Sequence, residues 1–282
     1  MEAARIWFIT GCATGFGRAL AAAALARGDQ VAVTDRDRAA VAEWEERYPD
    51  TALALQLDVT RQDEIMAALD TAFERFGRID LLVNNAGYGL QGATEEASEA
   101  EIRRLFDINL FGMIAIIRAA LPRLRAQGTA RIFNFASVGG RVSGPLLALY
   151  AASKFAVEGL SLGLAQELAD FGITVTAIEP GAFATRFGAS AAAPAHQIDA
   201  YAPLRDGMAA MLDQLPQGEP ETLAEAVLTL ADTEQPPLQF IGGGDAYAMI
   251  EQELERQQTE MRVWRPLSEA ANSRAQRRTS AG

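Results

Sequence analysis

Histidine and cysteine are almost absent from this chain of 282 residues: His196 is its only histidine and Cys12 its only cysteine. One cysteine excludes an intramolecular disulfide. One histidine argues against the common zinc sites and excludes a Ser-His-Asp triad. We therefore expect no metal site, and any acid–base chemistry must depend on residues other than histidine.

Long apolar runs and positive charge are also scarce. No apolar run reaches the roughly 18 residues that a membrane-spanning helix needs, and residues Met1–Arg5 lack the layout of a signal peptide. These features predict a cytoplasmic protein with no membrane span. The 37 acidic and 25 basic residues give a net charge of -12. Because such a surface repels phosphate groups, we expect no nucleic-acid partner.

Lysine is the rarest basic residue, because Lys154 stands alone beside 24 arginines. It follows Tyr150 by four residues, so in a helix the two side chains lie on one face. A free phenol has a pKa of about 10, and a nearby ammonium lowers it toward the range where the phenol exchanges protons near neutral pH. Taken alone, the spacing is equally compatible with a lysine placed on a helix surface by chance.

Short apolar runs alternate with longer helical stretches along most of the chain. Runs that are apolar throughout are typical of strands covered on both faces of a parallel sheet. The sequence thus predicts an α/β fold: a doubly wound, Rossmann-type parallel seven-stranded sheet with helices on both faces. The predicted strands are Ile6–Thr10, Gln30–Thr34, Ala52–Leu57, Leu81–Asn84, Ala130–Phe135, Thr174–Ile178 and Leu238–Ile241. The predicted helices are Phe16–Arg27, Arg38–Tyr48, Gln62–Phe76, Ser98–Arg125, Leu149–Phe171 and Pro220–Asp232.

The chain is predicted to form a single domain over residues 1–264. A long connection at about residues 182–216 interrupts the alternation, and a connection of that length inside a domain is typical of a lid. Asp245–Trp264 has the pattern of a final helix. Residues 265–282 are predicted to be a flexible tail.

Three glycines follow the first predicted strand and open a helix. Gly11, Gly15 and Gly17 permit a tight turn and let the backbone approach a diphosphate, while the N-terminus of the helix adds N–H donors. A glycine trio alone often makes only a turn. Its position between a strand and a helix is what favours a dinucleotide site.

The end of the second predicted strand carries two opposing signals about the cofactor. Asp35 can accept hydrogen bonds from a ribose 2′-hydroxyl and repels a 2′-phosphate, which favours NAD. Arg36 follows directly and is able to hold the 2′-phosphate of NADP. Because the glycine turn itself contains no Arg or Lys, we predict NAD, with NADP as the alternative.

Taken in order, these motifs resemble the short-chain dehydrogenase/reductase family in its single-domain branch. The resemblance covers about residues 5–245, and the sequence around Phe155 and Phe183 is similar to the hydroxysteroid and retinol dehydrogenases. Ala13 is a departure, at a place where serine or threonine is usual. The matching motifs are Thr10-Gly11-x-x-x-Gly15-x-Gly17, Asp58-Val59, Asn84-Asn85-Ala86-Gly87, Asn109, Ser137, Tyr150-x-x-x-Lys154 and Pro180-Gly181.

The resemblance implies an oxidoreductase that transfers a hydride between NAD(P) and a secondary alcohol or ketone. Tyr150 would be the general acid/base, and Lys154 would lower its pKa and bind the nicotinamide ribose. Ser137 would hold the substrate carbonyl, and Asn109 would kink a helix and position a water in a proton relay. The cofactor contacts that it implies are Gly11, Thr14, Gly15, Phe16, Gly17, Asp35, Arg36, Asp58, Val59, Asn85, Ala86, Gly87, Tyr150, Lys154, Pro180, Gly181 and Thr185.

The same resemblance implies a small apolar alcohol or carbonyl substrate. It also implies a homodimer or homotetramer formed through the helices expected at Ser98–Arg125 and Leu149–Phe171. A non-catalytic NAD(P)-binding sensor with the same fold is the alternative. A sensor needs no proton donor, so the intact Ser137, Tyr150 and Lys154 favour the enzyme.

Overall fold

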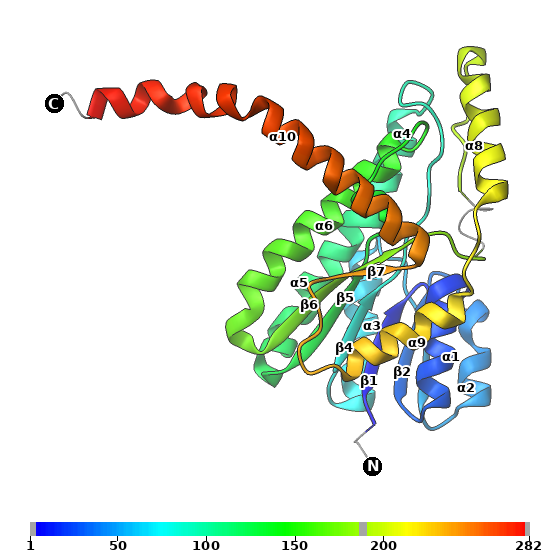
Figure 1. The fold of residues 1–282 in the computed structure, drawn as a ribbon. Helices are drawn as coiled ribbons and strands as arrows, with labels where there is room; N and C mark the ends of the chain where they lie inside the picture. Colours follow the sequence, from blue (N-terminus) through cyan, green and yellow to red (C-terminus); the bar gives the residue numbers. More distant parts are fainter. Residues whose placement is uncertain (1–3, 186–190, 280–282) are drawn as a thin grey trace.

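A single parallel sheet forms the centre of the molecule (Figure 1). The structure is a computed structural model that describes residues 4–185 and 191–279. Its strands lie in the order β3-β2-β1-β4-β5-β6-β7, and all neighbouring pairs are parallel, which confirms the predicted fold class. The strands are β1 (Ile6–Thr10), β2 (Gln30–Asp35), β3 (Ala52–Gln56), β4 (Leu81–Asn84), β5 (Ala130–Phe135), β6 (Ile173–Pro180) and β7 (Gln239–Gly242).

Helices cover both faces of this sheet (Figure 1). On one face lie α1 (Gly15–Ala26), α2 (Glu43–Arg47) and α9 (Pro220–Asp232). On the other lie α3 (Gln62–Phe76), α5 (Gly112–Gln127) and α6 (Ala148–Leu168). The remaining helices are α4 (Glu99–Phe106), α8 (Ala202–Gln214) and α10 (Gly244–Thr279), and the 3-10 turns are η1 (Arg38–Val41), η3 (Val138–Gly140), η4 (Ala169–Phe171) and η5 (Asp199–Tyr201).

The alternation of side chains along β1 explains why its sequence is apolar throughout. Trp7 and Ile9 point into the core under α1 and α9, whereas Phe8 points into the core under α3, α5 and α6. All three side chains are fully buried. Since each face of the strand has its own hydrophobic core, positions 6–9 are apolar, and the polar Thr10 stands at the end of the strand, where its hydroxyl donates to the carbonyl oxygen of Val83.

Two of the predicted helices differ in the structure. Residues 38–48 form the 3-10 turn η1 followed by the short α2 instead of one helix. The helix predicted at Ser98–Arg125 is interrupted by a π-helical turn, η2 (Asp107–Phe111), between α4 and α5. A π turn inserts one extra residue into the helical ladder, so it redirects the side chains that it carries.

One further prediction needs correction. Among the described residues, the helical run Glu99–Gln127 is long and apolar enough to cross a membrane by length and composition, although we expected no run of that length. Its apolar residues Ile116, Ile117 and Leu124 are buried in the core below the sheet. A helix that packs on a sheet needs such an apolar face in any case.

The direction of winding reverses between β1 and β4. These two strands are neighbours in the sheet, but the chain leaves β1 toward β2 on one side and β4 toward β5 on the other. In open α/β sheets, ligands bind in the crevice outside the carboxyl ends of the strands at this point. The glycine turn follows β1 and residues 85–87 follow β4, so the fold brings both to the crevice.

The predicted lid contains ordered structure. Residues 186–190 lie outside the described part of the chain, but η5 and α8 follow within the segment. Glu96 holds this segment, because its Oε1 accepts from Arg205 Nη1 at 2.6 Å and from the backbone N–H of Ile198 at 2.7 Å. Movement of the segment as a lid stays a prediction.

The last helix continues past the boundary that we predicted at Trp264. In Figure 1, α10 extends from the end of β7 far away from the body. Met261, Trp264 and Leu267 are exposed along it. Residues 265–279 are thus helical. That they form a flexible tail stays a prediction.

Candidate active site

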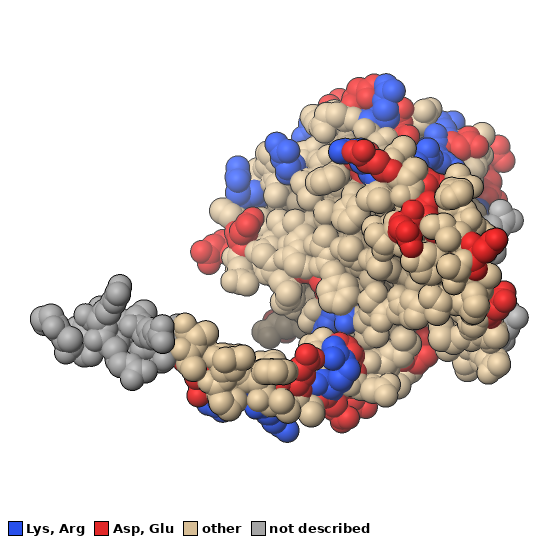
Figure 2. Space-filling view, turned by 90° about the horizontal axis from the view of Figure 1, so that it is seen from above, with Lys and Arg blue, Asp and Glu red and all other residues tan. Residues whose placement is uncertain are grey.

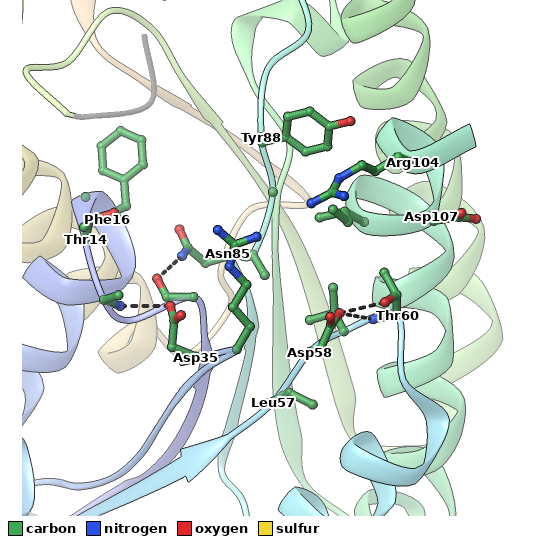
Figure 3. A pocket seen from close by; sticks show the side chains of 18 of the residues that line it. Thr14, Phe16, Asp35, Leu57, Asp58, Thr60, Asn85, Tyr88, Arg104 and Asp107 are labelled. Atoms are coloured by element: carbon green, nitrogen blue, oxygen red, sulfur yellow. Dashed lines mark hydrogen bonds between the residues drawn. The ribbon is translucent and has the colours of Figure 1, made fainter. Parts of the chain in front are cut away.

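A groove of about 840 Å³ opens at the carboxyl edge of the sheet, next to the β1–β4 reversal (Figure 3). It gathers predicted cofactor residues from five separate parts of the chain. Those that line it are Gly11, Thr14, Gly15, Phe16, Asp35, Arg36, Asp58, Val59, Asn85, Ala86, Gly87 and Thr185.

The glycine turn between β1 and α1 depends on glycine for two reasons. Gly11 and Gly15 have φ angles of 73° and 59°, in the left-handed region that other residues rarely adopt. A Cβ on Gly17 would lie 2.3 Å from the carbonyl oxygen of Gly11, so only glycine lets the helix start so close to the turn. Asn85 fixes the turn from β4, because its Nδ2 donates to the carbonyl oxygens of Thr10 at 2.8 Å and of Gly11 at 3.1 Å.

Asp35 connects the end of β2 to the glycine turn. Its Oδ2 accepts from the backbone N–H of Ala13 at 3.2 Å, and its Oδ1 accepts from the backbone N–H of Asp37 at 3.2 Å. These contacts orient a carboxylate at the groove wall. A carboxylate at this place suits a ribose with free hydroxyl groups.

Asp58 provides a second carboxylate on the groove wall. Its Oδ1 accepts from the backbone N–H of Thr60 at 2.9 Å and from Thr60 Oγ1 at 2.7 Å, as Figure 3 shows. Partial burial alone would raise the pKa of Asp58, but the two Thr60 bonds and the charges of Arg36 and Arg104 outweigh it, so this pKa is lowered. Asp58 is therefore an ionised acceptor at neutral pH.

Asn109 lies in the π turn η2 and is fully buried. Its Oδ1 accepts from the backbone N–H of Tyr88 at 2.9 Å. Its Nδ2 donates to the carbonyl oxygen of Tyr88 at 3.0 Å and to Ser153 Oγ at 3.1 Å. Ser153 Oγ in turn donates to the carbonyl oxygen of Tyr150 at 2.7 Å. The π turn thus connects the segment after β4 to the helix that carries Tyr150.

Ser137 and Tyr150 form the polar pair of the site. Their side chains are hydrogen bonded to each other, and Ser137 Oγ also accepts from the backbone N–H of Gly139 at 3.0 Å. A Cβ on Gly139 would lie 3.1 Å from the Tyr150 ring, so this glycine leaves room for the phenol. Burial raises the pKa of Tyr150 to about 12, and the Ser137 bond acts in the opposite direction.

Lys154 lies one turn further along α6 and is 4% exposed. Its Nζ donates to the carbonyl oxygen of Phe135 at 2.8 Å. Burial lowers the pKa of Lys154 to about 8, with the negative charge of Glu158 acting the other way. Burial is the largest influence on the pKa of Tyr150, and lowering of this pKa by Lys154 stays a prediction.

The four predicted catalytic residues are brought together beside the groove, although none of them lines it. Gly87 is the point of contact: a Cβ there would lie 3.1 Å from Asn109 Oδ1 and 3.7 Å from Lys154 Nζ. Because Gly87 also lines the groove, the polar cluster borders directly on it.

Comparison with known proteins shows the family. A family model described as short chain dehydrogenase matches residues 5–195. The chain belongs to the short-chain dehydrogenase family. It is 34% identical to the oxidoreductase BOA17 of Botryotinia fuckeliana over 271 aligned residues. The aligned region covers 95% of this chain and 99% of that protein.

Two solved structures support the same family membership. A short-chain dehydrogenase from Streptomyces avermitilis is 41% identical with a TM-score of 0.88, covering 95% of this chain and 99% of the other. A 3-ketoacyl-(acyl-carrier-protein) reductase from Brucella melitensis, solved with NADH, is 29% identical with a TM-score of 0.73, covering 86% and 98%. Short-chain dehydrogenases use NAD(P), and the groove has the glycine cradle and the paired acceptors Asp35 and Asp58 that such a dinucleotide needs.

The remaining predicted cofactor residues of this short-chain dehydrogenase lie behind or beyond the groove. The backbone N–H of Gly181 donates to the carbonyl oxygen of Gly242 at 2.8 Å, and the backbone N–H of Ala182 donates to Asp245 Oδ2 at 2.7 Å. The turn after Pro180 is therefore fixed by β7 and α10. Gly17 does not line the groove, because it lies against Gly11 and Asn85 behind the turn.

Sequence reasoning missed several residues of the groove wall. Figure 3 shows Arg104 reaching from α4 into the groove below Tyr88, opposite Thr14 and Phe16. Tyr88 directly follows the Asn84–Gly87 motif and could have been included on that ground. Arg104 had no local signal, since it is one of two adjacent arginines on a polar helix. The other missed residues are Ala13, Leu57, Thr60, Asp107, Ile108 and Ala192.

Proposed function

We propose that this chain is an NAD(P)-dependent oxidoreductase that interconverts a secondary alcohol and a ketone, with Tyr150 as general acid/base. One observation carries the proposal: the hydrogen-bonded pair Ser137 and Tyr150 lies beside Lys154 and Asn109 at the edge of the dinucleotide groove. With one cysteine and one histidine in the chain, the phenol is the residue available for proton transfer at this place.

In this mechanism the cofactor supplies or accepts the hydride, and the protein orients the reactants and moves a proton. Ser137 Oγ donates a hydrogen bond to the substrate oxygen and holds it beside the phenol. Tyr150 Oη gives its proton to that oxygen in reduction and takes it back in oxidation. The ammonium of Lys154 stabilises the phenolate that Tyr150 forms, which offsets the effect of burial on this group.

Asn109 acts on the backbone rather than on the substrate. Its amide is bonded to Tyr88 and Ser153, so it fixes the distance between the Gly87 segment and α6. That distance sets how far Tyr150 lies from the end of the groove. A water relay at Asn109 stays part of the proposal.

We infer a preference for NAD over NADP. The carboxylate of Asp35 is held at the groove wall by Ala13 and Asp37, which places a negative charge where a 2′-phosphate would have to lie. Arg36 and Arg104 also line the groove and favour the opposite choice. We expect the effect of Asp35 on cofactor choice to outweigh that of the two arginines, because two backbone donors fix the orientation of its carboxylate.

The substrate is proposed to be a small apolar alcohol or carbonyl compound. Leu146 packs with Ala93 and Met208 of α8, and Leu147 and Tyr201 border this cluster. Figure 2 looks down on the carboxyl edge of the sheet, where charged side chains gather mainly around the rim and the middle is largely uncharged. Such a surface suits an apolar substrate that enters between α8 and the body.

A homodimer or homotetramer is part of the proposal. Large apolar side chains are exposed on the helices that we expected at subunit contacts: Phe111 is 56% exposed, and Phe155 on α6 is 45% exposed. Exposed aromatic residues on packed helices are typical of surfaces that a second subunit covers. The cytoplasmic location remains a prediction.

A substrate panel with a variant tests the function. Purified protein is incubated with secondary alcohols and ketones, and the absorbance of reduced cofactor is followed with NAD and NADP in parallel. Turnover by the wild type, and its loss by at least about 10²-fold in Tyr150→Phe with NADH binding retained, supports the proposal. Binding of NADH without turnover of any substrate favours the alternative, a non-catalytic sensor.

A further inference from the structure

Two buried glutamates lie directly beneath the proposed proton-transfer site. Glu158 follows Lys154 by one turn of α6 and is 5% exposed, and Glu179 at the end of β6 is 0% exposed. Their carboxyl groups lie within hydrogen-bonding range of each other. Neither belongs to the groove, and the mechanism above uses neither of them.

The partners of the two carboxyl groups differ. Arg141 Nη1 donates to both oxygens of Glu179, at 3.1 and 3.4 Å. Gln239 Nε2 donates to Oε2 of Glu158 at 2.9 Å. No backbone, amide or guanidinium donor of the described residues reaches Oε1 of Glu158. Glu179 therefore has the surroundings of a carboxylate, and Glu158 has those of a carboxylic acid.

Two negative charges within hydrogen-bonding distance in a protein interior are costly, so one proton is shared by such a pair. Among the described residues no donor reaches Oε1 of Glu158, so a proton on this carboxyl group, donated to Glu179, would satisfy it. Burial, together with the charge of Glu179, raises the pKa of Glu158 to about 7, and burial also raises that of Glu179. The geometry and the direction of these shifts agree.

The place of the proton matters for Lys154. The charged and titratable groups that face Glu158 are Lys154 on its own helix, Glu179 from β6 and Arg141 from the turn after η3. If Glu158 is protonated, the charges of Arg141 and Glu179 cancel each other. The ammonium of Lys154 then has no negative charge of Glu158 beside it. An ionised Glu158 would instead compensate that ammonium and weaken its effect on a phenolate at Tyr150.

We propose that Glu158 holds a proton that it donates to Glu179, and that this acid pair makes Glu158 a positioning residue that keeps the Lys154 charge available to Tyr150. The packing is tight enough to preserve the arrangement. A Cβ on Gly140 would lie 3.0 Å from Glu158 Cγ and 3.0 Å from the carbonyl oxygen of Lys154. The inference rests on the proposed function of Tyr150, but the pair itself can be measured without it.

Two isosteric variants separate this role from a structural one. Glu158→Gln keeps a neutral donor toward Glu179 at every pH. Glu179→Gln leaves Glu158 as the only carboxyl group of the pair, so it puts the negative charge next to Lys154. Both variants remove one carboxyl group and keep the shape, and a purely structural role predicts equal effects.

The first measurement uses the fact that the chain has a single lysine. With ¹⁵Nζ-labelled lysine, one side-chain signal reports the titration of Lys154. We expect its midpoint in Glu158→Gln to lie near the wild-type value, because both carry a neutral group at this position, and to be higher in Glu179→Gln than in Glu158→Gln by about one pKa unit. Equal midpoints in the two variants would overturn the proposal.

The second measurement is the oxidation of 1-phenylethanol, an apolar secondary alcohol, with NAD. A one-unit rise in the pKa of Tyr150 lowers the phenolate fraction about tenfold, so at pH 6 Glu179→Gln should be about tenfold slower than Glu158→Gln in kcat/KM. Superimposable pH profiles of the two variants would also refute the proposal. If the wild type does not oxidise this alcohol, that result counts against the proposed function with this substrate, and the Lys154 titration alone decides the acid pair.

Discussion

Replacing Gly17 by alanine tests whether the turn after β1 is shaped for a bound dinucleotide. A Cβ at this position would lie 2.3 Å from the carbonyl oxygen of Gly11 and 2.6 Å from Asn85 Nδ2. Ordinary van der Waals contacts of a Cβ begin at 3.4 Å. Because the Gly11 oxygen belongs to the backbone of the turn, the turn itself must shift by about 1 Å to accept the methyl group.

The size of the effect follows from the cost of overpacking, about 1–3 kcal/mol. If the whole cost falls on the bound state, the Kd for NADH rises by about 5- to 150-fold. If it falls on folding instead, the midpoint of thermal unfolding drops by roughly 2–4 °C per kcal/mol. We expect most of it in binding, since the displaced Gly11 lines the groove.

The assay is a titration with NADH followed by protein fluorescence, together with a thermal unfolding curve. Gly163→Ala is the matched control, because Gly163 lies within α6 and a Cβ there would meet no atom of the described residues within 4 Å. Alanine is favoured over glycine inside a helix by about 1 kcal/mol, so this variant should keep its NADH affinity and be at least as stable as the wild type. A Gly17→Ala protein with the Kd and unfolding midpoint of the wild type would refute the reasoning.

Three further predictions concern the polar residues around the groove. Asp35→Ala should raise the NADPH-to-NADH ratio of kcat/KM by about tenfold or more, because one negative charge is removed; an unchanged ratio would show that Asp35 does not face the ribose. Asn109→Ala leaves two partly buried backbone groups of Tyr88 without the Asn109 amide, at about 1–3 kcal/mol each, so chemical denaturation should show a clear loss of stability, and a loss below about 1 kcal/mol would contradict this. The raised pKa of Glu158, about 7 against 4.5, makes its contribution to stability full below pH 4.5 and lost as the pH rises toward 7. Glu158→Gln should flatten this part of the pH dependence of the unfolding free energy, and an unaltered curve would count against a raised pKa.

Much of the fold was predictable because its signals are local. β1, β4 and β5 begin and end at the predicted residues, since strands buried on both faces are mostly apolar and stand out from their flanking residues. The interruption at Asp107–Phe111 was not predictable in the same way. A π turn depends on the bonds that Asn109 makes with Tyr88 and Ser153, which are far away in the sequence.

For the candidate site, too, local features were predictable from the sequence and contacts between distant segments were not. The sequence alone determined which chemical groups are available: a glycine turn, two carboxylates after strands, and one lysine spaced one helical turn from a tyrosine. Only the tertiary structure decided that Gly87 touches both Asn109 and Lys154, that Arg104 enters the groove, and that Glu158 meets Glu179. Spacing along a chain fixes which side chains share one helix face, whereas burial and contacts between distant segments, which set the pKa values here, arise only when the helices pack on the sheet.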